Sequence, residues 1–166
     1  EVERYARHLV LREVGGQGQQ RLKAASVLMV GAGGLGAPAS LYLAAAGVGR
    51  IVLADGDMVD TSNLQRQVIF RDADVGARKV EAAAAHLRAL NRHVQVDCAP
   101  VYVTPANAGS LVEGVDLVLD GTDDFATRFA VNAACVAHRR TLVSGAIGRW
   151  TGQVGVFAGR PCYRCL

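Results

Sequence analysis

The sequence is poor in aromatic residues, methionine and proline, and it has no long apolar run. Aromatic residues make up 5% of the 166 residues, with one tryptophan, two methionines and four prolines. The apolar stretches have the length of a strand, well short of the roughly 20 residues that a membrane helix needs. No basic segment followed by an apolar one resembles a signal peptide. We therefore expect a cytoplasmic protein without a membrane partner.

Charge of one sign is not concentrated anywhere in the chain. The 18 basic and 15 acidic residues are scattered and give a formal net charge of +3, whereas a nucleic-acid-binding arm would carry a basic block. Hydrophobic residues make up 51% and charged residues 20% of the chain, which is typical of a globular domain. A chain of this length can bury a core without disulfides. We expect one compact unit with no nucleic-acid partner.

The four cysteines fall into two groups. Cys98 lies in a predicted strand and Cys135 in a predicted helix, where we expect both to be small buried apolar residues. Cys162 and Cys165 form a C-x-x-C pair. A structural zinc site usually takes four ligands, so this pair is half of a Zn²⁺ site. We expect that a longer protein continues past Leu166.

Strand-like and helix-like segments alternate after residue 25. Short apolar runs predict strands at 27–30, 51–54, 94–98, 115–119, 142–144 and 153–157. Helical periodicity predicts helices at 38–46, 78–90 and 124–138, and the loop at 56–70 holds at most one helical turn. This order is typical of an α/β fold with a Rossmann-like, doubly wound, mainly parallel sheet. Residues 1–25 predict an N-terminal arm of two short helices, at 2–14 and 19–25, ahead of a main domain at 26–166 that we expect to be truncated at its C-terminal end.

A glycine-rich turn joins the first predicted strand to the first long helix. Gly31, Gly33 and Gly36 satisfy G-x-G-x-x-G, where missing side chains let the backbone approach a nucleotide and the helix N-terminus faces its negative charge. Asp55 ends the next strand, where this fold places the acid that binds a ribose hydroxyl. The pattern predicts a nucleotide site, but it fits a nicotinamide-dependent oxidoreductase as well as an enzyme that uses ATP.

Two cations and one acid follow that can handle a triphosphate. Arg66 can bind phosphate oxygens through two parallel N–H groups, and Lys79 can do so as a mobile point charge. Either cation alone is more often a solvated surface charge. Asp123 follows another strand and offers the hard oxygens that Mg²⁺ prefers beside phosphates. Alternatively, Asp123 or Asp124 caps the helix that follows.

Six motifs follow one another along the chain. They are Gly31-x-Gly33-Gly34-Leu35-Gly36, Asp55-x-Asp57, Ser62-Asn63-Leu64-Gln65-Arg66-Gln67, Gly76-x-x-Lys79, Asp120-x-Thr122-Asp123 and Pro161-Cys162-x-x-Cys165. Each is common alone, but their order and spacing resemble the ThiF/MoeB/HesA family, relatives of the ubiquitin-activating enzymes. The resemblance extends from Arg4-Tyr5-x-Arg7 to the last residue.

The resemblance implies an ATP-dependent adenylyltransferase. In such an enzyme the C-terminal glycine of a ubiquitin-like sulfur carrier ending in Gly-Gly, ThiS-like or MoaD-like, attacks ATP in thiamine or molybdopterin biosynthesis, and pyrophosphate leaves. The nucleotide-binding residues implied are Gly34 through its backbone, Asp55 at the ribose, Asn63, Arg66 and Lys79 at the phosphates, their neighbours Ser62, Leu64 and Gln65, and Asp123 with Mg²⁺. The resemblance also gives catalytic roles to Arg66, Lys79 and Asp123, and to Arg7, which would reach the partner's site in a homodimer.

Two departures from the family pattern limit this interpretation. Asp124 stands where relatives often have asparagine, and an added negative charge near phosphates would weaken ATP binding unless it points away. Family members also continue with a second C-x-x-C pair, a crossover loop and, in some, a cysteine for sulfur or thioester chemistry. Two alternatives remain: a nicotinamide-dependent oxidoreductase, which leaves the segment Ser62–Arg66, Lys79 and the cysteine pair unexplained, and a non-catalytic scaffold that docks a ubiquitin-like protein.

Overall fold

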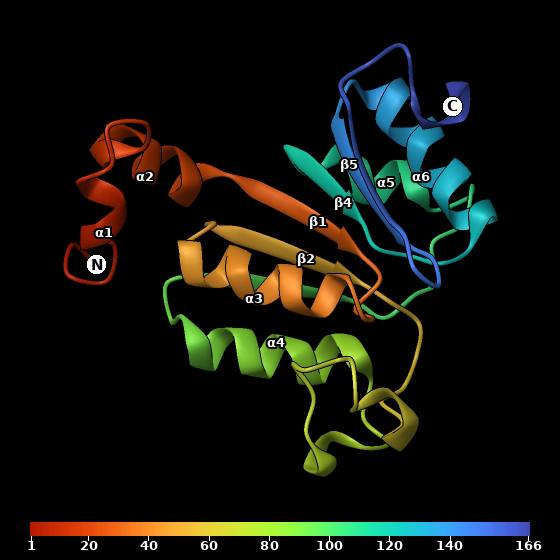
Figure 1. Cartoon of the computed structure of the whole chain (residues 1–166), viewed down its shortest axis with the longest axis horizontal. Helices are drawn as coiled ribbons and strands as arrows, with labels where there is room; N and C mark the ends of the chain where they lie inside the picture. The colour runs from red at the N-terminus through yellow and green to blue at the C-terminus, as the bar shows by residue number, and fades with distance from the viewer.

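A six-stranded sheet forms the centre of the molecule in a computed structural model that describes residues 1–166. Its strands are β1 (Ser26–Val30), β2 (Arg50–Ala54), β3 (Gln95–Ala99), β4 (Leu117–Asp120), β5 (Thr141–Ile147) and β6 (Gly152–Phe157). They lie in the order β3-β2-β1-β4-β5-β6, and only β6 runs antiparallel to its neighbour. The predicted Rossmann-like, mainly parallel sheet is confirmed (Figure 1).

Helices cover both faces of this sheet. One face carries α3 (Gly36–Ala46) and α4 (Lys79–Leu90), and the other carries α5 (Ala108–Glu113) and α6 (Phe125–His138) (Figure 1). The three predicted helices agree with α3, α4 and α6 to within two residues at either end. Helix α5 was not predicted, because Pro105, Gly109 and Gly114 make its short sequence look like a loop. No helix is long and apolar enough to cross a membrane.

The central strands are apolar on both faces because each face has its own core. Val27 and Met29 of β1 pack in the cluster beneath α3 and α4, while Leu28 and Val30 pack in the cluster beneath α5 and α6. Strand β2 divides its side chains between the two clusters in the same way. Doubly covered strands are expected to be continuous apolar runs, and this pattern made them readable in the sequence.

Only one of the two isolated cysteines is buried as predicted. Cys135 faces the core from α6, and burial raises the pKa of its thiol to about 12. Cys98 is exposed, so its predicted burial is wrong. The reason is that β3 lies at the edge of the sheet, where only its residue Val96 is fully buried.

The first 25 residues form a helical arm at the amino edge of the sheet. Its helices are α1 (Ala6–Leu9) and α2 (Gly15–Ala24), so the first is far shorter than the predicted 2–14. Helix α1 has no side-chain cap at Tyr5 and no acidic residue in its first turn, which leaves it little local support. Helix α2 begins earlier than predicted, at glycines that look like helix breakers in the sequence.

Tyr5 anchors the arm to the domain. Its ring is buried against Gly47, whose φ of 82° ends α3, and its hydroxyl accepts a hydrogen bond of 2.8 Å from Asn91 Nδ2. Asn91 also donates to the carbonyl of Ala44 at 2.7 Å. The arm therefore rests on the C-terminal ends of α3 and α4. This is the amino edge of the sheet, opposite to the carboxyl ends of the parallel strands.

Candidate functional site

The glycine turn is tightly closed between β1 and α3. Gly31 has a φ of 86°, and a Cβ at Gly36 would collide with the carbonyl oxygen of Gly31. Helix α3 begins at Gly36, with its N-terminus at the carboxyl edge of the sheet. Its free N–H groups and its dipole favour a negatively charged group there. The turn has the geometry that the G-x-G-x-x-G pattern predicted.

The segment Ser62–Gln67 lies directly beside this turn. A Cβ built at Gly33 would be 3.7 Å from Gln67 Nε2, and one at Gly34 would be 3.9 Å from Arg66 Cδ. Two motifs that are far apart in the sequence therefore form one surface at the carboxyl edge. This is the edge at which doubly wound sheets bind their ligands.

Asp55 ties the glycine turn to the end of β2. Its Oδ2 accepts a 2.7 Å hydrogen bond from the N–H of Ala32, and its Oδ1 accepts one of 2.8 Å from the N–H of Asp57. Each carboxylate oxygen can accept a second hydrogen bond, and Asp55 is only partly buried. The side chain can therefore hold a ligand hydroxyl while it holds the turn.

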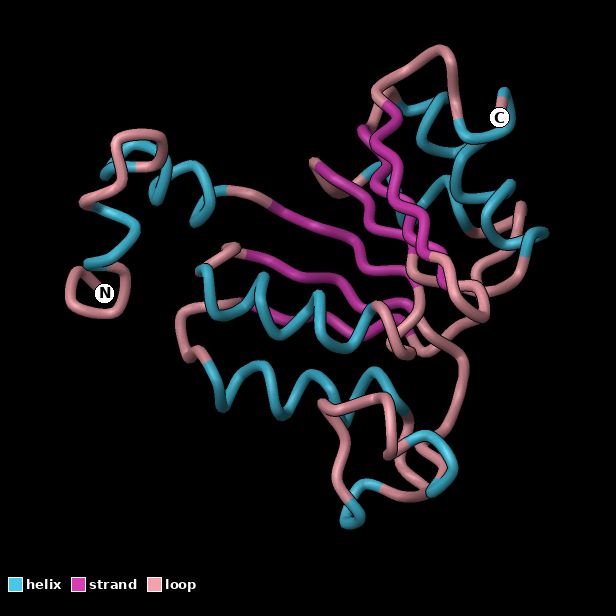
Figure 2. The backbone as a smooth tube through the Cα atoms, viewed as in Figure 1, coloured by secondary structure: helices cyan, strands magenta, loops and turns pink.

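A short 3₁₀ helix, η1 (Thr61–Asn63), shapes the long loop after β2 (Figure 2). Asp60 caps it by accepting a 2.7 Å hydrogen bond from the N–H of Ser62, and Arg66 Nη1 donates back to the carbonyl of Ser62 at 3.2 Å. The single helical turn predicted within 56–70 is confirmed. The side chains of Asn63 and Gln65 make no hydrogen bond within the chain, whereas Leu64 packs against the core.

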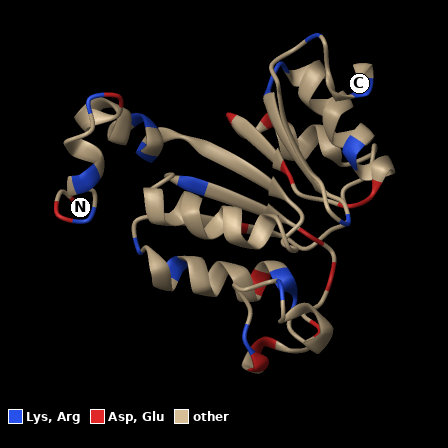
Figure 3. Ribbon diagram, in the orientation of Figure 1, with Lys and Arg blue, Asp and Glu red and all other residues tan.

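Lys79 is buried and paired, so it is neither the mobile point charge expected at the phosphates nor the solvated surface charge that was the alternative. Only 5% of the residue is exposed, and its Nζ lies 2.7 Å from Asp57 Oδ2. The hydrogen bond from Lys79, supported by one of 2.8 Å from the Tyr102 hydroxyl, holds the pKa of Asp57 below its ordinary value. The carboxylate raises the pKa of Tyr102 in turn. Figure 3 marks the acidic residues along the loop that leaves β2.

The loop after β4 resolves the alternatives for Asp123 and Asp124. Asp124 is the helix cap, because it accepts a 2.8 Å hydrogen bond from the N–H of Thr127 at the start of α6. This hydrogen bond lowers the pKa of Asp124. Asp123 is exposed, and its carboxylate makes no hydrogen bond or ion pair within the chain. The extra charge of Asp124 is therefore directed into the helix terminus.

The carboxylate of Asp123 and the cysteine pair suit different metal ions. Asp123 offers free, hard oxygens suited to Mg²⁺ that is also bound by phosphates. The Sγ atoms of Cys162 and Cys165 are 3.7 Å apart, close to the roughly 3.8 Å expected for two thiolates at about 2.3 Å from one tetrahedral zinc. Asn132 Nδ2 donates to Cys162 Sγ and lowers the pKa of that thiol. The chain holds no cluster of three or more His, Cys, Asp or Glu that could bind a metal.

Among the residues predicted to handle the nucleotide, Arg7 is the one that lies away from the others. It is exposed on α1, at the amino edge of the sheet, while the glycine turn is at the carboxyl edge (Figure 1). The full length of β1, which runs from the arm to the glycine turn, lies between α1 and that turn. A site that includes both must take Arg7 from a second chain.

Three residues near the site were not among the predicted site residues. Asp57 holds Lys79, and the Tyr102 hydroxyl donates to Asp57. Gln67 is 3% exposed beside Gly33, with its Oε1 buried and unbonded. Asp57 lies in the motif Asp55-x-Asp57 and Gln67 ends the motif Ser62–Gln67, so the sequence holds a signal for both. Tyr102 had no signal, because only the pairing of β2 with β3 brings it to the loop after β2.

Comparison with known proteins extends these observations. Over its whole length the chain is 48% identical to the adenylyltransferase and sulfurtransferase MOCS3 of Anopheles gambiae and also 48% identical to the sulfur carrier protein adenylyltransferase of Thermus thermophilus. It covers 38% of the first protein and 64% of the second. The chain therefore spans less than two thirds of the length of these curated relatives.

A solved structure and a family model agree with these relatives. The chain superposes on the structure of E. coli MccB with ATP at a TM-score of 0.88 and 28% identity, over 98% of this chain and 51% of that one. The model described as ThiF family matches residues 5–166. Because that match covers nearly the whole chain, including the arm from Tyr5 and the cysteine pair, the chain belongs to the ThiF family.

Proposed function

We propose that this chain is the adenylating part of an enzyme that uses ATP to activate the C-terminal glycine of a ubiquitin-like sulfur-carrier protein. In this proposal residues 26–166 are the adenylation domain and residues 1–25 an arm. The observation that carries it is the convergence of the glycine turn, the segment Ser62–Gln67 and the unpaired Asp123 at one edge of the sheet. The names of the relatives, a sulfur carrier protein adenylyltransferase among them, support the choice of reaction.

The chemistry needs positioning and charge more than a nucleophilic side chain. The carrier's own carboxylate attacks the α-phosphorus of ATP, the bond to the β-phosphate oxygen breaks, and an acyl adenylate and pyrophosphate result. Gly34 would approach the nucleotide through its backbone, Asp55 would hold the ribose, and Asn63, Arg66 and Lys79 would bind the phosphates. The E. coli MccB structure with ATP, which has the same fold, supports ATP as the ligand. A reaction that consumes ATP fits the cytoplasmic location expected from the sequence.

Two metal ions belong to the proposal. Asp123 would hold Mg²⁺ together with the phosphates, and the ion would neutralise charge that develops as pyrophosphate leaves. Cys162 and Cys165 would hold a structural Zn²⁺ with two further ligands from outside these 166 residues. The distance between the two Sγ atoms supports this role for the cysteine pair.

A homodimer completes the site in this proposal. Arg7 lies at the amino edge of its own sheet, so it can assist the phosphates only in the partner's site. The exposed position of Arg7 on an arm with its own anchor at Tyr5 supports such a reach.

The two alternatives fit the site less well. A nicotinamide-dependent oxidoreductase would use the glycine turn and Asp55 but leaves Arg66 beside Gly34 and the free Asp123 without a role. A non-catalytic scaffold would need neither. Calorimetric titration with ATP and with NAD separates the first alternative from the proposal, because only ATP is expected to bind.

The decisive test is ATP–pyrophosphate exchange with candidate carriers of the thiamine and molybdopterin type. We expect exchange that requires both Mg²⁺ and a carrier with its terminal Gly-Gly, and none with a carrier that lacks these two residues. Carrier binding without exchange would favour the scaffold. Exchange that is the same with the intact and the shortened carrier would contradict the proposal.

A further inference from the structure

Lys79 and Asp57 form an ion pair of unequal burial. The Lys79 side chain is 7% exposed and that of Asp57 is 47% exposed, with 2.7 Å between Nζ and Oδ2. The other carboxylate oxygen, Oδ1, accepts a 2.8 Å hydrogen bond from the Tyr102 hydroxyl. A buried ammonium without a partner is costly and tends to lose its proton. Asp57 therefore gives the Lys79 ammonium a charge partner in a position from which water is largely excluded.

These side-chain bonds are not needed to close the loop between β2 and α4. Backbone hydrogen bonds already close it, from the N–H of Lys79 to the carbonyl of Asp57 at 3.0 Å and from the N–H of Val59 to the carbonyl of Ala77 at 2.8 Å. Tyr102 is 67% exposed and adds little to the core. The role of the hydrogen bonds that link Lys79, Asp57 and Tyr102 is therefore to be found in how they hold Lys79.

The ammonium of Lys79 has donors to spare at the ligand-binding edge. It carries three N–H groups, and within the chain Asp57 takes one of them. Lys79 is the first residue of α4, whose N-terminus faces the carboxyl edge of the sheet. Asp57 follows the end of β2 and Tyr102 follows the end of β3, so both approach Lys79 from that edge.

We propose that Asp57 and Tyr102 are positioning residues that hold the Lys79 ammonium in a fixed place so that its free N–H groups meet the phosphates of the nucleotide. The inference rests on the proposed function only in taking a nucleoside triphosphate as the ligand. Asp57 orients Lys79, and Tyr102 orients Asp57 by occupying its second oxygen. The rival role is competition, in which the carboxylate keeps Lys79 away from the phosphates.

Calorimetric titration of the chain with ATP and with adenosine distinguishes these roles. Asp57→Asn should weaken ATP binding about 10-fold to 100-fold, in line with the loss of an orienting partner at a site. Tyr102→Phe should weaken it only about 2-fold to 5-fold, because it removes one neutral donor. Adenosine has no phosphates, so its affinity should stay that of the wild type in both variants. A merely structural role would weaken ATP and adenosine together, and competition would tighten ATP binding; either result overturns the proposal.

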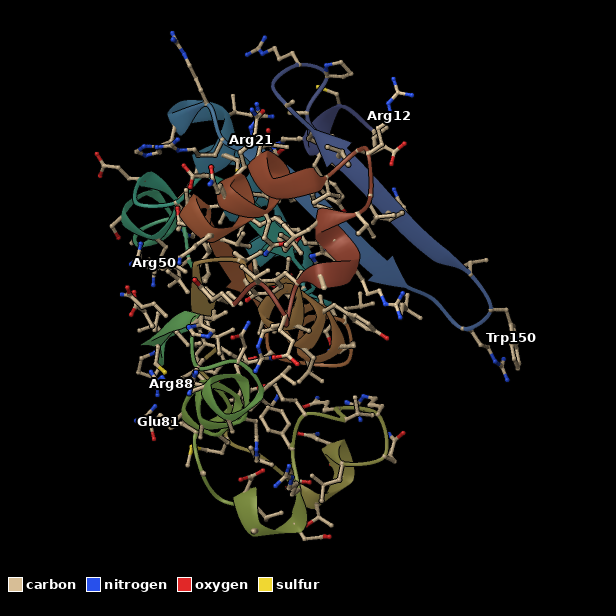
Figure 4. The ribbon with its side chains drawn as sticks, turned by 90° about the vertical axis from the view of Figure 1, so that its left-hand side faces the viewer. Arg12, Arg21, Arg50, Glu81, Arg88 and Trp150 are labelled. Carbon is tan, nitrogen blue, oxygen red and sulfur yellow. The ribbon has the colours of Figure 1, made fainter.

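A matched control exists on the outer face of β3. Asp97 also binds a cation at 2.7 Å, the Arg50 Nε, and both side chains are more than a third exposed. Figure 4 labels Arg50 and shows it on the periphery. Asp97→Asn removes a carboxylate from an ion pair of the same length outside the site, so ATP affinity should not change. A loss equal to that of Asp57→Asn would contradict the proposal.

The chain also permits a test that needs no nucleotide. It contains two lysines, Lys23 and Lys79, and each makes a 2.7 Å ion pair, but the Lys23 side chain is 61% exposed. Acetylation by acetic anhydride, followed by peptide mass spectrometry, gives the Lys79 rate relative to that of Lys23. Asp57→Asn should raise this ratio, because the Lys79 amine is no longer held by an ion pair in its buried position. An unchanged ratio would overturn the positioning role.

The two assays separate this inference from the proposed function. If wild-type protein does not bind ATP, the proposed function fails, and an unchanged acetylation ratio would show that the positioning role fails independently. If wild-type protein binds ATP, protection of Lys79 from acetylation by ATP should accompany binding and be lost in Asp57→Asn. ATP binding without protection of Lys79 would overturn the inference and leave the proposed function standing.

Discussion

Strands β2 and β4 lie on either side of β1, and an aspartate stands at the carboxyl end of each: Asp55 directly follows β2, and Asp120 is the last residue of β4. Each aspartate folds the next residues into the same local turn. Asp55 Oδ1 accepts a 2.8 Å hydrogen bond from the N–H of Asp57, and Asp120 Oδ1 accepts one of 3.0 Å from the N–H of Thr122. The second oxygen differs. In Asp55 it holds the glycine turn at Ala32, whereas in Asp120 it accepts from the hydroxyl of Ser144.

The difference in burial distinguishes Asp55, the acid that we propose holds the ribose, from a structural acid. Asp120 is 3% exposed and its hydrogen bonds all lie inside the fold, while Asp55 is only partly buried. The next acids along the two loops, Asp57 and Asp123, show the opposite arrangement. Asp57 is already paired with Lys79, whereas Asp123 has no partner. The loop after β2 thus presents a prearranged cation, and the loop after β4 presents a carboxylate that can bind a cation without giving up a bond.

The largest expected effect comes from removing the free carboxylate. Asp123→Ala should lower carrier-dependent ATP–pyrophosphate exchange about 1,000-fold, or about 4 kcal/mol, because nothing else in that loop can hold Mg²⁺ at the phosphates. Exchange at saturating carrier and Mg²⁺ measures it, with circular dichroism to confirm folding. Exchange within about tenfold of wild type would remove Asp123 from the site and end the contrast between the two loops.

The support beneath the loop after β4 should matter next. Arg128 is 4% exposed and donates to the carbonyls of Thr122 and Gly145, the latter at 2.7 Å, with its guanidinium 5.9 Å from the centre of the Tyr163 ring. Arg128→Met keeps the volume but leaves buried carbonyls unbonded, so the free energy of unfolding should fall by about 2–3 kcal/mol. Urea denaturation measures this loss. Arg149→Met, at the exposed tip of the hairpin β5–β6, should stay within about 0.5 kcal/mol of wild type.

Replacing Asp124, unlike replacing its neighbour Asp123, should have a smaller effect that concerns stability and not exchange. Asp124→Ala removes the cap of α6 and should lower the Tm by about 3 °C, while ATP–pyrophosphate exchange stays at the wild-type rate. Asp60 in the loop after β2 caps only the three residues of η1, so Asp60→Ala should lower the Tm less. Differential scanning calorimetry checks both shifts. A loss of exchange in Asp124→Ala would mean that the cap and the site cannot be separated.

The smallest effect concerns pH. The hydrogen bond from the N–H of Thr127 lowers the pKa of Asp124 from its ordinary 3.8, so the charged cap stabilises the folded chain above pH 3.8. This stabilisation is lost as the pH falls below 3.8 through the lower folded-state pKa. The Tm difference between wild type and Asp124→Ala should therefore be constant near neutral pH and shrink in that acidic range. A difference that persists in acid would show that the cap does not need its charge.

Local sequence signals predicted the parts of the fold that depend on neighbours in the chain. Strand β1, the glycine turn and α3 follow from an apolar run, three glycines and an alanine-rich helix within a few turns of chain. Helix α5 and the exposure of Cys98 were missed because they depend on packing and on strand order. Trp150 shows the same dependence: no local signal places it at the hairpin tip, 88% exposed (Figure 4).

Which residues reach the carboxyl edge of the sheet follows from the amino-acid sequence alone, because strand ends are local features and the alternation of strands with helices makes those ends coincide. Gly34, Asp55 and Asp123 stand shortly after such ends, and Lys79 begins the helix that leads from the loop after β2, so the order of elements suffices to bring them together. The state of each charge, in contrast, depends on tertiary contacts. Whether an ionised group is buried, paired, capping or free is set by partners distant in the chain, and in this fold those partners bury Lys79 against Asp57, leave Asp123 open and hold Arg7 at the opposite edge.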